Sequence, residues 1–434
     1  MNEETLFKRI EQLEAENLEL KKQLLATQKK VIDFEHRLRA YENAHTPPSK
    51  SRKKREPKEP SGKLGAKKGH PKWKREQPKP TETVEHSETE CPQCKHKLGK
   101  PTRTVRRVIE EIPKPQPIKV TEHLINHYEC NHCGKQVVAC NNVPKGMFGV
   151  NAETTTVLLR FEDRLPLRKV VNALNRQGLD MTNVCVQKIT NRTARKLLPE
   201  YTKQIQLLRA SRVVYADETG IKISGKNNWL WTFTGENATA YVVRKSRGHK
   251  VPEEILGKNF PGIITNDGHQ AYNKIGTKHQ RCWAHLIRES KELLEQHKLY
   301  ECHHNNLTKI FRKLKEIRAN PPPLKERLKL RKQLEKHITR LCDALDGHKQ
   351  YRQFTVKLRN AIPHLFTCII HLFVEPTNNI AERSLRELIV FRKIIGGLRR
   401  ECGARTLETI ATMLATWKQQ NKPLHPTLKK HLIG

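Results

Sequence analysis

The stretches VVYADETG at residues 213–220 and GIITNDGHQAYN at residues 262–273 decide the fold. Each contains a short apolar run that is typical of a strand buried in the sheet of an α/β protein. The first run leads to Asp217 and the second to Asp267. Side chains at strand ends project into the crevice where α/β folds place their chemistry. Further strand-like runs, such as GIKIS after RVVYADE, lie within residues 212–264, so we predict a mixed sheet with both carboxylates at strand ends. The residues HQAYNKI after Asp267 are helix-prone, so we expect a helix there.

A third carboxylate, Glu382, lies near the start of a predicted helix in NNIAERSLRE, residues 378–387. It also has a purely structural interpretation, because Asn379 could cap the helix with Glu382 at its third position, and Arg386 could form an i+4 ion pair. Carboxylates from distant segments that meet at one point can hold two divalent cations. Such ions activate a nucleophile and stabilise the leaving oxygen of a phosphodiester. Together with the two strand-end aspartates, Glu382 therefore makes a candidate metal site.

Two other acids compete for the role of third ligand. Glu218 directly follows Asp217, and Glu375 precedes the helix that carries Glu382. The dipeptide Asp267-Gly268 is also an ordinary turn sequence. The residues alone leave these alternatives open, since the chemistry needs three carboxylates that converge.

The balance of charge indicates a polyanionic partner. The chain has 434 residues, with 83 Lys and Arg against 45 Asp and Glu and a formal net charge of +38. Such an excess favours nucleic acid through phosphate neutralisation, although a ribosomal or structural nucleic-acid binder would share it. No apolar run is long enough to span a membrane, and the first residues lack the apolar core of a signal peptide. We therefore expect a cytoplasmic protein with no membrane partner.

Residues 3–41 carry a heptad pattern. Apolar side chains recur at spacings of 3 and 4, and Asn17 occupies one of the core positions. Heptads with one buried Asn resemble a parallel two-stranded coiled coil, in which the amide sets register and dimer state. The alternative is an amphipathic helix packed on its own body. We predict a coiled-coil dimerisation helix over residues 1–45, and hence a homodimer or a higher oligomer.

A basic linker is predicted at residues 46–82. Within it, residues 46–80 hold 13 Lys or Arg against three Glu, with repeated Pro and Gly. This composition cannot bury a core, so we predict disorder in the free protein. The segment is a solvated linker, a non-specific phosphate-binding arm, or both.

Two CxxC turns lie within residues 83–149, with Cys91 and Cys94 in the first and Cys130 and Cys133 in the second. Each turn presents two thiolates to one face of a tetrahedral Zn²⁺ ion, and two turns complete a closed structural site. The residues between the turns alternate like strands, so we predict a zinc ribbon. A redox dithiol would instead need only one pair in a thioredoxin-like setting.

Residues 150–210 are predicted to be helical. Pro166 suits the first position of a helix, Gly178 suits the end of one, and Thr182 suits the N-cap of the next. A helix, a short turn with Gly and a second helix are compatible with a DNA-binding helix-turn-helix. They are equally compatible with plain helical packing.

The sequence CWAH places Cys282 and His285 three residues apart. This pair could supply half of a second zinc site, with Cys302, His303 or His304 as partners. Nothing in the sequence selects among those partners. We therefore favour a structural or substrate-positioning role for His285.

In their order, YADET, TNDGHQAYN, CWAH, EPTNNIAERSLR and RKIIGG followed by GA resemble DDE transposases of bacterial and archaeal insertion sequences. More narrowly, they resemble insertion-sequence family sixty-six, of the TnpC type, over nearly the whole chain. The resemblance implies a multidomain α/β protein whose RNase H-like core, residues 211–434, carries an all-helical insertion at about 284–375. It also marks Asp217, Asp267 and Glu382 as the metal-binding triad.

The resemblance and the carboxylates lead to one predicted mechanism. Two Mg²⁺ or Mn²⁺ ions would be bridged by Asp217, with Asp267 and Glu382 completing one coordination shell each. One ion activates water to cut the 3′ end of the element, and the freed 3′-OH attacks target DNA. The predicted partners are double-stranded DNA, at the element ends and at the target, and accessory proteins of the same element. Candidates for phosphate contacts on the helix of Glu382 are Arg383, Arg386, Arg392 and Lys393.

Two other classes of function stay open. A relative without catalytic activity would act as a DNA-binding regulator, although all three carboxylates are present. A structure-specific nuclease on the same core would cut junctions without joining ends. In each case we expect the protein in the prokaryotic cytoplasm, associated with the nucleoid.

Overall fold

The computed structural model describes residues 13, 16–28, 30–31, 34, 79–111, 117–139 and 146–433. By internal contacts the chain divides into two units, residues 46–117 and the remainder. None of the helices in the described residues is both long and apolar enough to cross a bilayer.

Only part of the predicted coiled coil falls within the described residues, and residues 46–78 of the predicted linker fall outside them. Residues 16–28 are helical. Leu20 and Leu24, both predicted core positions of the heptad, are 62% and 59% exposed. Such exposure suits a helix whose apolar face meets a second copy, and the coiled coil stays a prediction.

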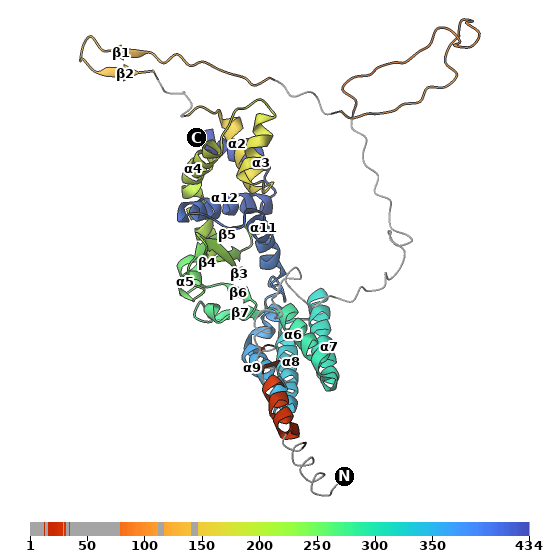
Figure 1. The fold of residues 1–434 in the computed structure, drawn as a ribbon, viewed down its shortest axis with the longest axis vertical. Coiled ribbons are helices and arrows are strands. Elements are labelled where there is room, and N and C mark those ends of the chain that lie inside the picture. The colour runs from red at the N-terminus through yellow and green to blue at the C-terminus, as the bar shows by residue number, and fades with distance from the viewer. Residues whose placement is uncertain are drawn as a thin grey trace, which may run out of the picture. The chain divides into compact units, whose positions relative to one another are not determined.

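A five-stranded mixed sheet organises the larger unit (Figure 1). Its strands are β3 (Val213–Ile223), β4 (Lys226–Thr234), β5 (Thr239–Arg244), β6 (Ile263–Asn266) and β7 (Lys278–Arg281). The spatial order is β5-β4-β3-β6-β7. The pairs β3–β4 and β4–β5 are antiparallel, whereas β3–β6 and β6–β7 are parallel. The predicted mixed α/β architecture is confirmed.

Three details of the sheet differ from the prediction. The runs RVVYADE and GIKIS form one long strand, β3, which turns into β4 at Ser224 and Gly225. Both turn residues have positive φ, 49° and 76°, as a two-residue hairpin requires. The helix expected after Asp267 is only a 3₁₀ turn, η1 (Gln270–Tyr272). Strand β7 was not predicted, because its sequence KHQR contains no apolar residue.

The edge strand β5 is covered by α12 (Glu401–Gln419). Three side chains spaced four apart on α12 accept hydrogen bonds from alternate backbone N–H groups of β5. Thr416 accepts from Thr239 at 3.1 Å, Thr412 from Tyr241 at 2.9 Å, and Glu408 from Val243 at 2.8 Å. The helix thus satisfies donors that an edge strand would otherwise present to another chain.

The two faces of the sheet are covered differently. On one face, Val214 and Ala216 of β3 pack with α5 (Lys250–Leu256) and with η1. On the other face, Val213 and Tyr215 join the core of the helical lobe that follows β7. Further along β3, α11 (Asn379–Ile395) packs through Leu385, Leu388 and Phe391 against the sheet. Successive β3 residues therefore face different surroundings.

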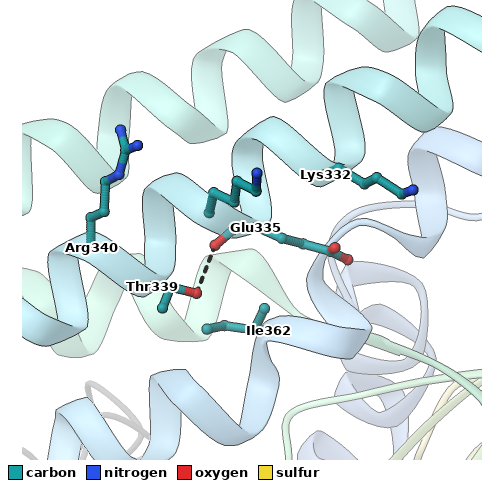
Figure 2. A pocket seen from close by; sticks show the side chains of 6 residues that line it. Lys332, Glu335, Thr339, Arg340 and Ile362 are labelled. Atoms are coloured by element: carbon teal, nitrogen blue, oxygen red, sulfur yellow. Dashed lines mark hydrogen bonds between the residues drawn. The ribbon is translucent and has the colours of Figure 1, made fainter.

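The stretch between β7 and α11 is helical, as the predicted insertion requires. Its helices share one core around Trp283, Tyr300, Leu314 and Phe366. A shallow pocket between α8 and α9 has an exposed basic rim of Lys332, Lys336 and Arg340 (Figure 2). The elements are α6 (Trp283–Gln296), η2 (Lys298–Tyr300), α7 (Glu301–Ala319), α8 (Leu324–Leu345), η3 (Lys349–Tyr351), α9 (Arg352–Leu365) and α10 (Thr367–Ile370).

Three helices lie within residues 150–209 and share a core with the C-terminal helices. Thr182 caps α4 by accepting from the N–H of Cys185, as predicted. Pro166 is the N-cap of α3 rather than its first residue. Gly178, at φ +85°, lies in the turn after α3. The elements are α2 (Val150–Phe161), α3 (Leu167–Asn175), α4 (Asn183–Arg209) and, packed against them, α12 and α13 (Leu424–Ile433).

The second CxxC turn lies in a short antiparallel hairpin, β1 (His127–Glu129) with β2 (Gln136–Val138). The other strands predicted for the ribbon are absent from the described residues 101–111 and 117–126.

Candidate active site

Asp217 and Asp267 meet at one edge of the sheet. In the parallel pair of β3 and β6, Tyr215 lies opposite Thr265, and each aspartate follows two residues later. The parallel pairing of β3 with β6 covers residues 213–215 and 263–265, so the two aspartates follow it at the same level and come to one place. The prediction that Asp217 ends its strand is wrong, because β3 continues past it to Ile223 through its pairing with β4. Asp267 does follow the last residue of β6. Asp267 is held by a turn in which its Oδ1 accepts the N–H of His269 at 2.9 Å.

Glu382 reaches the same edge from α11. Asn378, the residue before this helix, donates through Nδ2 to the Ala216 carbonyl at 2.8 Å. This bond ties the start of α11 to the β3 residue that precedes Asp217. The peptide N–H of Glu382 donates to the Asn378 carbonyl at 3.1 Å, which places Glu382 in the first turn.

The capping box at Asn379, the alternative interpretation of Glu382, is not formed. Asn379 is the first helical residue, the N-cap is Asn378, and no side chain caps the helix. Glu382 therefore stands at the fourth helical position. Its carboxylate lies 3.8 Å from Nδ1 of His285, which is a different partner from the predicted Arg386. The side-chain amide of Asn378 donates to the sheet instead of capping its own helix. This bond positions the start of α11.

The electrostatics confirm that the acids share one neighbourhood. Burial raises the pKa of Asp217 well above its usual range, and the charges of Asp267, Glu218 and Glu382 raise it further. The N–H of Glu218 partly offsets this by donating to Asp217 Oδ1 at 2.9 Å. Concentrated negative charge of this kind disfavours ionisation until a cation is present.

Glu218 is already neutralised by side chains on the α5 side of the sheet. Its Oε1 accepts two bonds from Arg247, at 3.0 and 2.8 Å, and its Oε2 accepts the Tyr272 hydroxyl at 2.7 Å. The carboxylate is 1% exposed. Glu375, the other rival ligand, pairs with Arg318 at 3.1 Å and is 51% exposed. Both acids thus have partners of their own.

Comparison with known proteins identifies the family of this chain. The sequence model described as "Transposase IS66 family" matches residues 145–406, which include all three carboxylates. The chain belongs to the IS66 transposase family. An uncharacterized protein of Sinorhizobium fredii, y4qI, is 24% identical, and the match covers 60% of this chain. The match spans 54% of that relative's own length.

The cationic residues of α11 in this IS66 family chain fall into two groups. Arg383 and Arg386 are exposed and lie one turn apart. Lys393 is exposed near the end of the helix. Arg392 is half-buried and donates to the Thr219 hydroxyl at 3.1 Å and to the Gly220 carbonyl. Arg392 thus fastens α11 to β3, which is a different use from the predicted phosphate contact.

A second pocket adjoins the start of α11. Lys315 of α7 lies over the Phe311 ring, 4.5 Å from its centroid. Both residues line this pocket together with Ala284, Arg318, Glu375 and Asn379. Arg318 is paired with Glu375 in the wall of this pocket, so Lys315 is the cation that the pocket presents at the start of α11.

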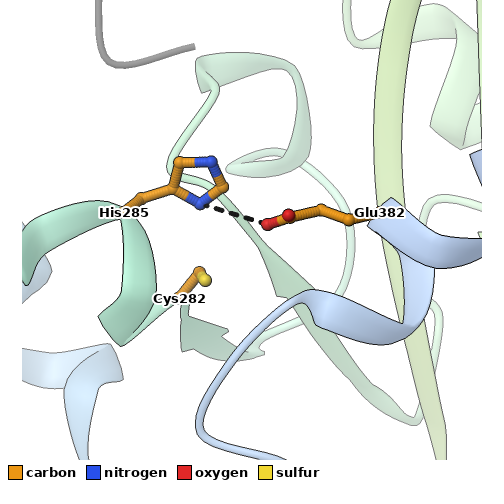
Figure 3. Close-up of side chains that lie close together, drawn as sticks. All are labelled: Cys282, His285 and Glu382. Carbon is orange, nitrogen blue, oxygen red and sulfur yellow. Dashed lines mark ion pairs between the residues drawn. The ribbon is translucent and has the colours of Figure 1, made fainter. Parts of the chain in front are cut away.

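Cys282 and His285 find a partner that the sequence did not indicate (Figure 3). Their ligand atoms and a carboxylate oxygen of Glu382 all lie within 4.8 Å of one another. The partners considered from sequence are engaged elsewhere: His304 contacts Ser290 at 3.0 Å, and His303 stacks on Tyr300. Within the part of the chain that the structure describes, the start of α11, distant in sequence, completes this group.

The predicted zinc ligands form two turns of the same local geometry. In the first, backbone N–H groups of Gln93 and Cys94 lower the pKa of the Cys91 thiol. In the second, the N–H groups of residues 132 and 133 act in the same way on Cys130. Such N–H donors stabilise thiolate, the form that binds metal. The four-cysteine site itself stays a prediction.

Proposed function

We propose that this chain is the transposase of an insertion sequence, which cuts the 3′ ends of the element and joins them to target DNA. The observation that carries the proposal is the convergence of Asp217, Asp267 and Glu382 at one sheet edge. The five-strand order and the helical insertion before α11 support the RNase H-like core that we infer for it.

The donor set fits magnesium or manganese. All three groups are carboxylates, and hard oxygen ligands suit Mg²⁺ and Mn²⁺. Burial, and next the repulsion from neighbouring carboxylates, raise the pKa of Asp217, and a divalent cation would offset both. When bound, two such ions supply an activated nucleophile and stabilise the leaving oxygen of the phosphodiester.

The surrounding residues hold this geometry rigid. Asn378 ties the start of α11 to β3, and Arg392 ties its end to the same strand. Beneath the site, Arg247 and Tyr272 neutralise Glu218, so this acid does not compete for the metals. Carboxylates on strands and on a packed helix need little reorganisation before reaction.

Double-stranded DNA is the proposed substrate and partner. The exposed Arg383 and Arg386 lie on the same helix as Glu382 and can contact phosphates beside the cutting site. Lys315 and Arg318 line the adjoining pocket. The net charge of +38 supplies the general attraction.

The other parts of the chain have proposed roles that follow from the same reaction. The coiled coil would bring two chains to two element ends, and the Zn²⁺ ribbon and the α3–α4 pair would contribute to DNA binding. Accessory proteins of the same element are further proposed partners. A nucleoid-associated site of action in a prokaryote follows from this function.

The test is a strand-cleavage and strand-transfer assay with the full chain and end sequences of its element. We expect Asp217→Asn to lower cutting by more than about 100-fold, because even changes outside a coordination shell cost 10–100-fold. Binding to DNA should persist. Asp163→Asn, at an exposed position in the turn after α2, is the matched control and should cut normally.

The products discriminate the three functions. Cut ends joined to a target support the transposase. Cutting without joining indicates a nuclease, and binding alone indicates a regulator. If Asp217→Asn cuts as fast as the Asp163→Asn control in Mg²⁺, the assignment of the carboxylates is wrong.

A further inference from the structure

A second set of metal-ligand atoms overlaps the proposed catalytic carboxylates. Cys282 follows β7 directly, and its N–H donates to the Asn266 carbonyl of β6 at 3.0 Å. His285 lies in the first turn of α6, and Glu382 lies in the first turn of α11. Figure 3 shows the three side chains converging from these two helix starts. One sulfur, one ring nitrogen and one carboxylate oxygen lie within 4.8 Å of one another.

The turn at Cys282 repeats the local geometry of the two CxxC turns of the same chain. The sulfur of Cys282 receives N–H groups from Ala284 and His285, two and three residues later. The sulfurs of Cys91 and Cys130 receive N–H groups from the same relative positions. In this chain, CWAH is therefore a third turn built like a metal knuckle, with His in place of the second Cys.

A further donor at Cys282 comes from outside its own turn. The Asn378 N–H points at the sulfur at 3.1 Å. The same Asn378 side chain fixes the start of α11 on β3. One residue thus holds together the thiol and the helix that carries Glu382. Among the residues that the structure describes, Glu382 Oε1 is buried and receives no hydrogen bond.

The chemistry of these donors differs from that of the carboxylate site. Thiolate and imidazole select borderline cations such as Zn²⁺, whereas Mg²⁺ takes oxygen ligands. With Zn–S near 2.3 Å and Zn–N near 2.0 Å, a tetrahedral ion needs sulfur and nitrogen about 3.5 Å apart. Closing from at most 4.8 Å requires a shift of about 1 Å, within reach of side-chain rotation.

We propose that Cys282, His285 and Glu382 form a three-ligand site for Zn²⁺ or a similar transition-metal cation, and that its occupation inhibits DNA cutting. Zn²⁺ held by Cys282 and His285 would take Oε1 of Glu382, the oxygen that lies 3.8 Å from His285 Nδ1, and so remove this oxygen from the ions held by Asp217 and Asp267. The inhibitory half of the inference rests on the proposed function. The binding half does not.

Cobalt binding tests the first half without any activity. The full chain, freed of metal, is titrated with Co²⁺, whose absorption reports tetrahedral thiolate ligation, and the bound equivalents are counted. We expect Cys282→Ser and His285→Gln each to bind one Co²⁺ fewer than the native chain. Cys342→Ser, at a buried cysteine of the helical lobe, is the control and should bind as the native chain does. If both site variants fold and still bind the native amount, the site does not exist.

Zinc inhibition tests the second half. Cutting in Mg²⁺ by the native chain and by Cys342→Ser should fall as Zn²⁺ is added, and should return on its chelation. Suppose that Cys282→Ser loses one Co²⁺ but that the native chain cuts equally well with and without Zn²⁺. The inhibitory role would then be overturned, and the metal site would stand. A chain that binds Co²⁺ through Cys282 but cuts no DNA in Mg²⁺ would refute the proposed function while supporting the metal site.

Discussion

Removing the Tyr272 hydroxyl tests how the acidic edge of the sheet is kept in place. Tyr272 is fully buried, and its hydroxyl donates at 2.7 Å to Glu218, whose side chain is 1% exposed. In Tyr272→Phe, Oε2 of Glu218 loses this donor while Oε1 keeps both bonds from Arg247. A hydrogen bond to a charged group contributes about 1.5–3 kcal/mol, so we expect that decrease in the free energy of unfolding.

The same substitution at Tyr300 is the matched control. Tyr300 is also fully buried, but its hydroxyl contacts the uncharged Ser290 hydroxyl at 3.3 Å. Tyr300→Phe should cost only about 0.5–1.5 kcal/mol. Urea unfolding followed by circular dichroism measures both variants, and a preserved m-value shows that the denatured states are comparable.

A double-mutant cycle isolates the contact with the carboxylate. In a Glu218→Gln background the acceptor is neutral, so Tyr272→Phe should cost about 1 kcal/mol or less. An equal cost in both backgrounds would refute the account, because the hydroxyl would then stabilise the fold through something other than the charge on Glu218.

Two further predictions follow from buried polar groups. Thr412→Val leaves the Tyr241 N–H without its acceptor on α12 and should lower the free energy of unfolding by about 1–3 kcal/mol. The hydroxyl of Thr409 donates to the Arg405 carbonyl within the same helix, so Thr409→Val should change the free energy of unfolding little in the same denaturation. Equal losses of stability in the two variants would contradict the edge-strand argument. Burial, and next the neighbouring positive charge, lower the pKa of His279 to about 4. The native state therefore binds fewer protons than the unfolded chain between about pH 4 and 6.5. The free energy of unfolding should therefore fall by about 2 kcal/mol from pH 7 to pH 5, and His279→Leu should reduce this loss. If the variant lost as much stability as the native chain over this pH range, His279 would not be the group responsible.

Much of the candidate site could be predicted from local pattern. The apolar runs before Asp217 and Asp267 identify two buried strands, since a short buried run has few other uses in an α/β protein. Only Asp267 lies at a strand end, because pairing with β4 extends β3 beyond Asp217 to Ile223. The helix of Glu382 and the N-cap at Thr182 follow from spacing and capping chemistry. Each of these signals lies within a few residues of the feature that it predicts.

Other features depend on contacts between residues far apart in the chain. Strand β7 has a polar sequence, and it is a strand because β6 offers it a parallel partner. The Asn378 side chain donates to the Ala216 carbonyl of β3 and does not cap its own helix. This acceptor is within reach because α11 packs against the folded sheet. Arg392, by sequence an ordinary surface cation, is bound to β3.

The sequence by itself determined which chemistry is present: two carboxylates that follow apolar runs, a third at a helix start, and sulfur ligands at fixed spacing in knuckle turns. Tertiary structure decided which of them meet. It joined Cys282 and His285 to Glu382 across about a hundred intervening residues, and it neutralised Glu218 with Arg247 and Tyr272. Local spacing restricts the backbone only over a turn or a strand, whereas burial and charge pairing are settled when distant segments pack against one another.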